Sequence, residues 1–110
     1  MKKFLVLYMA PITSFEQLMK NTTPEQQKAG MAEWLGWSKK VGSALVDLGA
    51  PLGKSLRLTR TGASPVKNEL GGYSIMQGES KEALAESLKG HPHFTIPDGY
   101  IEIVELVPMG

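Results

Sequence analysis

Two histidines, His91 and His93, lie in the segment GHPHFTIPDGY at residues 90–100, with Pro92 between them. Imidazole titrates near neutral pH, so a histidine in a pocket can move protons when a carboxylate orients it. Two imidazoles could also begin a zinc site, but zinc takes three or four protein ligands, and the chain has no cysteine and no third histidine. We therefore predict no metal and no other cofactor, and both a structural role and a pocket role stay open for the pair.

The two histidines are predicted to have different roles. Gly90 suits the left-handed position just past a helix, so His91 would hydrogen-bond the last carbonyl groups of a helix at 81–89. His93, redirected by Pro92, would point into a cleft between sheet and helix. His93 is the candidate catalytic residue, and His91 is kept among the candidate ligand contacts.

Asp47 is the candidate catalytic partner of His93. It stands in the apolar run ALVDLG, where a carboxylate must be solvated, paired or hydrogen-bonded. In a cavity it could act as a base or orient a histidine, whereas at an exposed sheet edge it would only face water. Both interpretations stay open.

Three aromatic residues, Tyr8, Trp34 and Trp37, are candidate ligand-binding residues. The two tryptophans are three positions apart, which places them on one side of a helix. Core packing explains Trp34, whereas Trp37 lies nearer the edge of the apolar stripe and could form the wall of a pocket. Tyr8 ends the first predicted strand, where its ring would join the core or present its hydroxyl to a ligand.

The first elements of the chain have clear signals. The run KFLVLYMA at residues 3–10 is apolar at both odd and even positions, which predicts a strand covered on both faces. Thr23-Pro24-Glu25-Gln26 predicts a capped helix that runs from Pro24 to about Val41. The helix face predicted to lie against the sheet comprises Met31, Trp34, Leu35, Ser38 and Val41.

The remaining chain alternates between predicted strands and one short helix. The segments are a strand at 43–52, a half-exposed strand near Lys54–Thr61, a loop ASPVKNEL, a strand at 71–78, a helix at 81–89 capped by Ser80, and a strand at 100–107. This order predicts a single α+β domain over residues 1–110, of the ferredoxin-like split βαβ plan with one extra strand. Its uncovered sheet face would be apolar, so we predict a homodimer that joins two sheets into an α+β barrel.

Composition excludes several classes of function. The 110 residues carry a formal net charge of +1, with basic residues scattered along the chain, which argues against a nucleic-acid partner. No apolar run reaches membrane-spanning length, and the apolar N-terminal run ends at Pro11 without a cleavage signal. We expect a cytoplasmic protein with no membrane partner.

Two long segments, LGGYSIMQGESKEALAESLKGHPHF and IEIVELVPM, together with MKKFLVLYM and VGSALVDLGAPLG, resemble the YCII-related domain family. That family includes the YciI-like and DGPF-domain proteins. The resemblance implies a dimeric ferredoxin-like α+β barrel with a pocket between sheet and helix. It also implies relatives that act on small molecules, such as dehydrochlorinases of hydroxylated aromatics. The helix histidine of the family's proposed acid–base pair is absent here, and SPVKNELGGY replaces the DGPF stretch.

Two classes of function follow. The first is a small-molecule-binding protein, including an enzyme that acts by proton transfer on a small, aromatic organic substrate in a sheet–helix pocket. The second is a non-catalytic homodimeric interaction or regulatory domain. Convergence of His93 and Asp47 on one cavity would favour the enzyme, and the sequence leaves open whether the chain is one.

Overall fold

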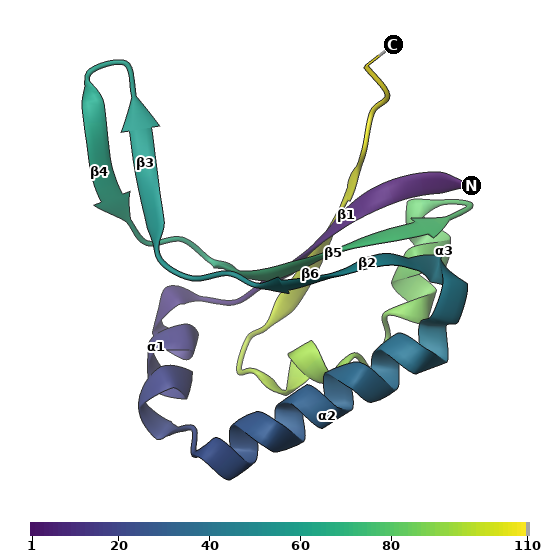
Figure 1. Ribbon diagram of the computed structural model, residues 1–110, viewed down its shortest axis with the longest axis horizontal. Coiled ribbons are helices and arrows are strands. Elements are labelled where there is room, and N and C mark those ends of the chain that lie inside the picture. Colours follow the sequence, from purple (N-terminus) through teal and green to yellow (C-terminus); the bar gives the residue numbers. More distant parts are fainter. Residues whose placement is uncertain (110) are drawn as a thin grey trace.

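The computed structural model describes residues 1–109 as a twisted antiparallel sheet with helices on one face and a projecting hairpin (Figure 1). The elements are β1 (Lys2–Met9), α1 (Ile12–Asn21), α2 (Pro24–Val41), η1 (Gly42–Ala44), β2 (Leu45–Pro51), β3 (Ser55–Thr59), β4 (Gly62–Val66), β5 (Leu70–Gly78), α3 (Lys81–Ser87), η2 (Pro92–Thr95) and β6 (Tyr100–Glu105). Both η1 and η2 are 3₁₀ helices.

The fold class predicted from the sequence is confirmed. The main sheet has the order β2-β5-β1-β6, and every neighbouring pair is antiparallel. Apart from α1 and the hairpin β3–β4, the chain runs β1-α2-β2-β5-α3-β6, with β5 inserted between β1 and β2. This is the ferredoxin-like arrangement.

The central strand β1 is apolar on both faces, as its sequence predicts. Phe4, Val6 and Tyr8 are buried under the helices, whereas Leu5 and Leu7 are half-buried on the opposite face. The register places Leu7 beside residues of the same face on both neighbouring strands, Tyr73 on β5 and Glu102 on β6. Among the described elements, no helix covers that face, which we call the open sheet face (Figure 1).

Helix α2 has the predicted bounds, and the side that it presents to the core is shifted from the predicted one. The Thr23 hydroxyl accepts from the Gln26 amide, and the Gln26 side chain accepts from the Thr23 amide, so the capping box is present. Met31 and Leu35, predicted to face the sheet, are 57% and 46% exposed, whereas Trp37 is buried.

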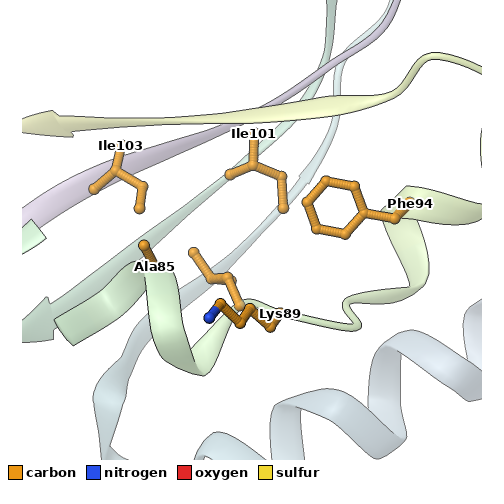
Figure 2. Close-up of a pocket in the computed structure, with 6 residues that line it drawn as sticks. Ala85, Lys89, Phe94, Ile101 and Ile103 are labelled. Atoms are coloured by element: carbon orange, nitrogen blue, oxygen red, sulfur yellow. The ribbon is translucent and has the colours of Figure 1, made fainter. Parts of the chain in front are cut away.

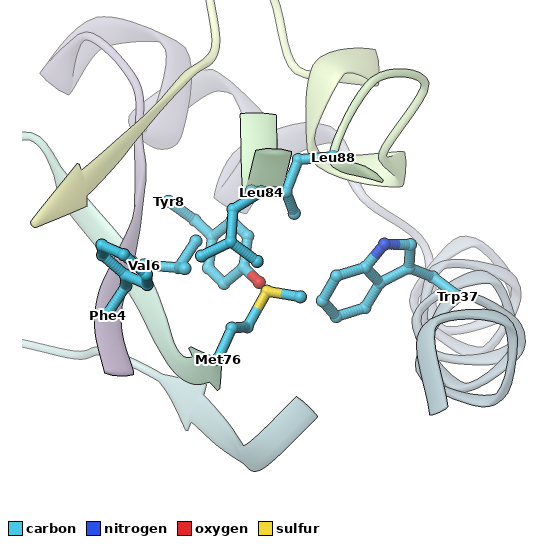
Figure 3. Packing of buried hydrophobic residues seen from close by; sticks show 7 residues of the cluster. All are labelled: Phe4, Val6, Tyr8, Trp37, Met76, Leu84 and Leu88. Carbon is cyan, nitrogen blue, oxygen red and sulfur yellow. The ribbon is translucent and has the colours of Figure 1, made fainter. Parts of the chain in front are cut away.

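The buried stripe of α2 comprises Trp34, Trp37 and Val41, which recur at helical spacing and contact the core. Figure 3 shows the Trp37 indole reaching from α2 toward Met76 and Leu88. The sequence prediction was right for Trp34 and Val41, which pack against the core, and wrong for Met31 and Leu35. Two apolar stripes share the helix, and the larger indoles occupy the inner one.

The segment predicted as one extra strand and a loop forms a two-stranded hairpin, so the loop prediction for ASPVKNEL was wrong. Leu56 pairs with Pro65, and Leu58 pairs with Ala63. Both leucines are largely exposed, and the hairpin rises away from the helices on the side of the open sheet face (Figure 1). Glycine and proline are uncommon in strands, which is why β4 (Gly62–Val66) has a weak sequence signal.

Candidate functional site

The His-Pro-His segment turns the chain from α3 into η2. Gly90 has a φ of +75°, as expected just beyond a helix, and the His91 backbone N–H donates to the Leu88 carbonyl at 3.1 Å. Pro92 then opens η2, whose N-cap is His91. The His91 Nδ1 atom accepts from the His93 backbone N–H at 2.9 Å. The side chain therefore caps the following helix and does not bond the carbonyl groups of the preceding one.

This capping bond directs the His91 ring into an aromatic cluster. The ring stacks on Tyr8, with centroids 4.9 Å apart and planes 26° apart. It meets Trp34 and Trp37 edge-on, with centroids 4.7 Å and 4.4 Å away. Only 2% of His91 is exposed. The sequence predicted that His93 would lie beside the tryptophans, and the structure places His91 there.

Two nitrogens in this cluster have no hydrogen-bond partner among the described residues. They are Nε2 of His91 and Nε1 of Trp37, and both are buried. Burial, and secondarily the neighbouring His93, lower the pKa of His91 to about 4. His91 is therefore neutral at physiological pH, with its proton on Nε2 because Nδ1 accepts the His93 amide hydrogen.

The His91 and Trp37 rings lie at the wall of an open groove of about 520 Å³ between α2 and the α3–η2 segment. The α2 side of the groove also includes Glu33, Gly36 and Lys40. The other side comes from residues 87, 89, 90, 92, 94 and 95. This volume is in the range of small-molecule sites.

A second, smaller hollow of about 130 Å³ lies between α3 and β6. Its apolar lining includes Ile101 and Ile103 from β6, with Ala85 from α3 (Figure 2). Phe94 and Lys89 contribute to both hollows. Phe94 is 49% exposed, so its ring forms an accessible boundary between the two.

The Tyr8 hydroxyl donates its hydrogen bond inside the protein. It donates to Ser74 Oγ at 2.9 Å, and Ser74 Oγ donates to the Leu48 carbonyl at 2.7 Å. Burial raises the pKa of Tyr8 to about 12, although the Ser74 bond acts in the opposite direction. Tyr8 therefore contributes its ring face to the cluster, while its hydroxyl joins β1, β5 and β2.

His93 and Asp47, the predicted catalytic pair, are not brought together. His93 is 4% exposed, and its Nε2 donates to the Met9 carbonyl at 2.7 Å. Asp47 is exposed on β2, where its carboxylate accepts from the Gly49 amide at 2.9 Å. Asp47 also pairs with Ile75, a residue of the open sheet face, whereas His93 packs on the helix side. Whether either residue acts in catalysis stays a prediction.

The sequence analysis did not identify Glu33, Lys40 and Phe94, which line the groove, or Ser74, which lies outside it, as site residues. Ser74 is buried and orients Tyr8, but a serine in a strand carries no signal of its own. The signal for the inward turn of His91 was present in the motif: a polar side chain before Pro92 at the first helical position can cap the helix.

No group of three or more His, Cys, Asp or Glu side chains is placed to hold a metal ion within residues 1–109. None of the helices in that range is both long and apolar enough to cross a membrane.

The fold and the buried aromatic site define an α+β protein with a ferredoxin-like sheet and a groove in its helix layer. A solved structure with this fold is the 5-chloro-2-hydroxyhydroquinone dehydrochlorinase TftG from Burkholderia phenoliruptrix AC1100, in complex with 2,5-dihydroxybenzoquinone. The alignment covers 98% of this chain and 95% of that one, with a TM-score of 0.50 and 15% identity. At this identity the likeness shows the fold alone. No family model and no curated protein sequence matches the chain.

Proposed function

We propose that this protein binds a small organic molecule in the groove between α2 and η2. The observation that carries the proposal is the pair of buried, unpartnered nitrogens on His91 and Trp37, whose rings line the groove. Buried polar atoms are nearly always hydrogen-bonded, so each exception calls for an explanation. A ligand with a polar group at this position supplies one.

The surroundings support a ligand with a flat, partly apolar body. Trp37 and Phe94 give the groove aromatic walls, and Gly36 leaves space where a side chain would otherwise project. A small oxygenated ring fits this description, and TftG was solved with such a compound, 2,5-dihydroxybenzoquinone. The sequence resemblance to the YCII-related domain family supports the same class of ligand, and we propose that the chain belongs to that family.

A blocking substitution tests the groove directly. A Cβ at Gly36 would meet no atom within 4 Å, so Gly36→Leu can be accommodated while its side chain fills part of the groove. Gly30→Leu is the matched control, because a Cβ there also meets nothing and Gly30 does not line the groove. We expect Gly36→Leu to abolish the response of the Trp37 indole N–H signal to aromatic fragments and Gly30→Leu to retain it. Equal fragment binding by both variants would contradict this location.

A proton-transfer reaction in the groove is the catalytic form of this proposal. The His93–Asp47 pair predicted from the sequence does not converge on the groove, and neutral His91 already uses Nδ1 as an acceptor. Among the described residues that line the groove, Glu33 is the one carboxylate, so it is the candidate base. His91 would donate a hydrogen bond to substrate rather than accept a proton.

We also propose that two copies associate through the open sheet face. Leu5, Leu7 and Ile75 make this face apolar, and exposed apolar surfaces of this kind are typical of interaction sites. The hairpin residues 52–68 carry four basic and no acidic residues, which leaves the rest of the chain with a net charge of −3. Asp47 and Glu102 are exposed on the strands of this region, so a basic hairpin from one copy would meet an acidic surface on the other.

A further inference from the structure

The hydrogen-bond pattern of His91 determines which of its nitrogens carries the proton. A backbone N–H can only donate, so the Nδ1 atom that receives the His93 amide hydrogen must be an acceptor. In a neutral imidazole the other nitrogen then holds the proton. Nε2 of His91 is therefore an N–H donor with no acceptor among residues 1–109.

Trp37 provides a second donor of the same kind. Indole Nε1 can only donate, and in the described chain it also lacks an acceptor. The His91 and Trp37 ring centroids are 4.4 Å apart, and both rings line the same groove. A buried donor without a partner has lost its hydrogen bond to water without replacing it, so the cluster contains two such penalties side by side.

We propose that the His91 and Trp37 N–H groups together form a donor pair for an anionic oxygen, and that the ligand is a small planar oxyanion such as an aromatic carboxylate or phenolate. This inference rests on the proposed binding function and specifies its ligand class. Two donors on adjacent rings match an acceptor-only group, and hydrogen bonds to a charged oxygen are about twice as strong as neutral ones. Neither a cation nor a hydrocarbon satisfies them.

Charges around the groove agree with an anion. Lys40 lines it from α2 and Lys89 from the turn just after α3, where Lys89 also pairs with Glu86 at 2.9 Å. Glu33 lies in the same groove and opposes an anion. Trp37 stands one turn from Glu33 and one turn from Lys40 on α2, so the oxyanion belongs on the Lys40 side of the Trp37 ring. Lys40 stands seven residues beyond Glu33, which is two turns along the helix.

The donor pair lies beneath the surface of the groove. Both nitrogens are sealed from water, so an anion reaches them after a wall side chain moves aside. Phe94 is half exposed, and Gly36 on the facing helix has no side chain. The opening is therefore expected between these two residues, and it requires no change in the sheet.

A matched set of probes tests the ligand class. Benzoate, benzamide and benzamidine share a planar ring and nearly one shape, but they present an anionic acceptor, a neutral amide and a cationic donor respectively. We expect benzoate to bind at least tenfold more tightly than benzamidine, as measured by titration of the Trp37 indole N–H signal. We also expect Trp37→Phe, which keeps an aromatic ring and loses the donor, to lower benzoate affinity about tenfold and to leave benzamidine unchanged. For this variant the titration follows the indole N–H signal of Trp34, whose ring centroid lies 6.1 Å from that of Trp37.

The outcomes separate this inference from the proposed function. If benzoate and benzamidine bound equally well and Gly36→Leu blocked both, the donor pair would be refuted. The same result would support the groove as the binding site. Absence of binding by all three probes at millimolar concentration would overturn both proposals. Imidazole ¹⁵N shifts give a test without ligand: a protonated Nδ1 on His91 in the native protein would overturn the donor pair, and a protonated Nε2 supports it.

Discussion

The His91 imidazole lies stacked on the Tyr8 phenol ring, with centroids 4.9 Å apart and planes 26° apart. The two residues are far apart in sequence, and each is fixed by its own hydrogen bond. Tyr8 donates to Ser74, and His91 accepts from the His93 amide. This stacked pair joins the central strand β1 to the turn before η2, and thereby fixes the position of the groove relative to the sheet.

The first prediction concerns the hydroxyl network beneath that stack. Tyr8→Phe removes one bond but leaves the Ser74 hydroxyl donating to the Leu48 carbonyl, so we expect a loss of about 1 kcal/mol in unfolding free energy. Ser74→Ala leaves both the Tyr8 hydroxyl and the Leu48 carbonyl without this partner, at a cost of about 1–3 kcal/mol. Urea unfolding measures both. A larger loss of unfolding free energy for Tyr8→Phe than for Ser74→Ala would contradict a network in which Tyr8 donates to Ser74 and Ser74 donates to the Leu48 carbonyl.

The second prediction concerns pH. The pKa of His91 is lowered from 6.5 to about 4, chiefly by burial. The unfolded chain protonates His91 near pH 6.5, and the folded chain does so only near pH 4. The free energy of unfolding is therefore unaffected by His91 above pH 6.5 and decreases as the pH falls from 6.5 toward 4. At about 1.4 kcal/mol per pKa unit, the loss is about 3 kcal/mol at most.

The control for this pH dependence is His91→Phe, which keeps a ring without the titrating group. Urea unfolding is compared between pH 7 and pH 4, and the difference between the two proteins isolates His91 from other groups. Five other ionisable or charged groups face this ring or its groove, and both proteins retain them, so their effects on the pH dependence of unfolding cancel in the difference. They are Tyr8, Glu33, Lys40, Lys89 and His93. Parallel pH profiles would show that His91 does not titrate as stated.

The sequence predicted those features that depend on local signals. The capping box at Thr23 and Gln26 set the start of α2, and the apolar run of β1 predicted a strand with two apolar faces. The buried side of α2 could not be predicted in the same way. Two apolar stripes compete on that helix, and the choice between Leu35 and Trp37 depends on the shape of the tertiary contact.

The predicted placement of the two histidine side chains was wrong for a different reason. Both histidines are buried, and the one that lies beside the tryptophans is determined by a bond across Pro92, from the His93 amide to His91 Nδ1. The hydrophobic pattern carries no information about that bond. Asp47 was placed on the correct strand, but a bulge and a local bond to Gly49 turn it to the exposed side. Side-chain direction at irregular positions is set by such bonds.

The third prediction concerns assembly. Leu7 lies at the centre of the open sheet face, so Leu7→Lys should convert a homodimer into a monomer in sedimentation experiments at micromolar concentration. Leu35→Lys is the control, since it places the same change on the exposed side of α2 and should leave the dimer intact. A wild-type protein that sediments as a folded monomer would refute the association.

The fourth prediction concerns the hairpin. Leu58 is 79% exposed in the protomer, so Leu58→Lys should change protomer stability by less than about 0.5 kcal/mol. If the hairpin contacts the second copy, the same substitution should weaken dimerisation at least tenfold. Analytical ultracentrifugation over a dilution series measures this effect, with Leu35→Lys again as the control. An unchanged dimerisation constant would place the hairpin outside the interface.

The last prediction separates the two histidines with which the sequence analysis began. His93 is buried, and its Nε2 donates to the Met9 carbonyl at 2.7 Å, so His93→Ala should cost about 1–3 kcal/mol of stability and leave benzoate affinity unchanged. His91→Ala removes a donor from the groove, so it should lower benzoate affinity about tenfold in addition to any loss of stability. Thermal unfolding and titration of the Trp37 indole signal give the two readouts. If His93→Ala lost benzoate binding and His91→Ala retained it, the ligand-binding role would belong to His93.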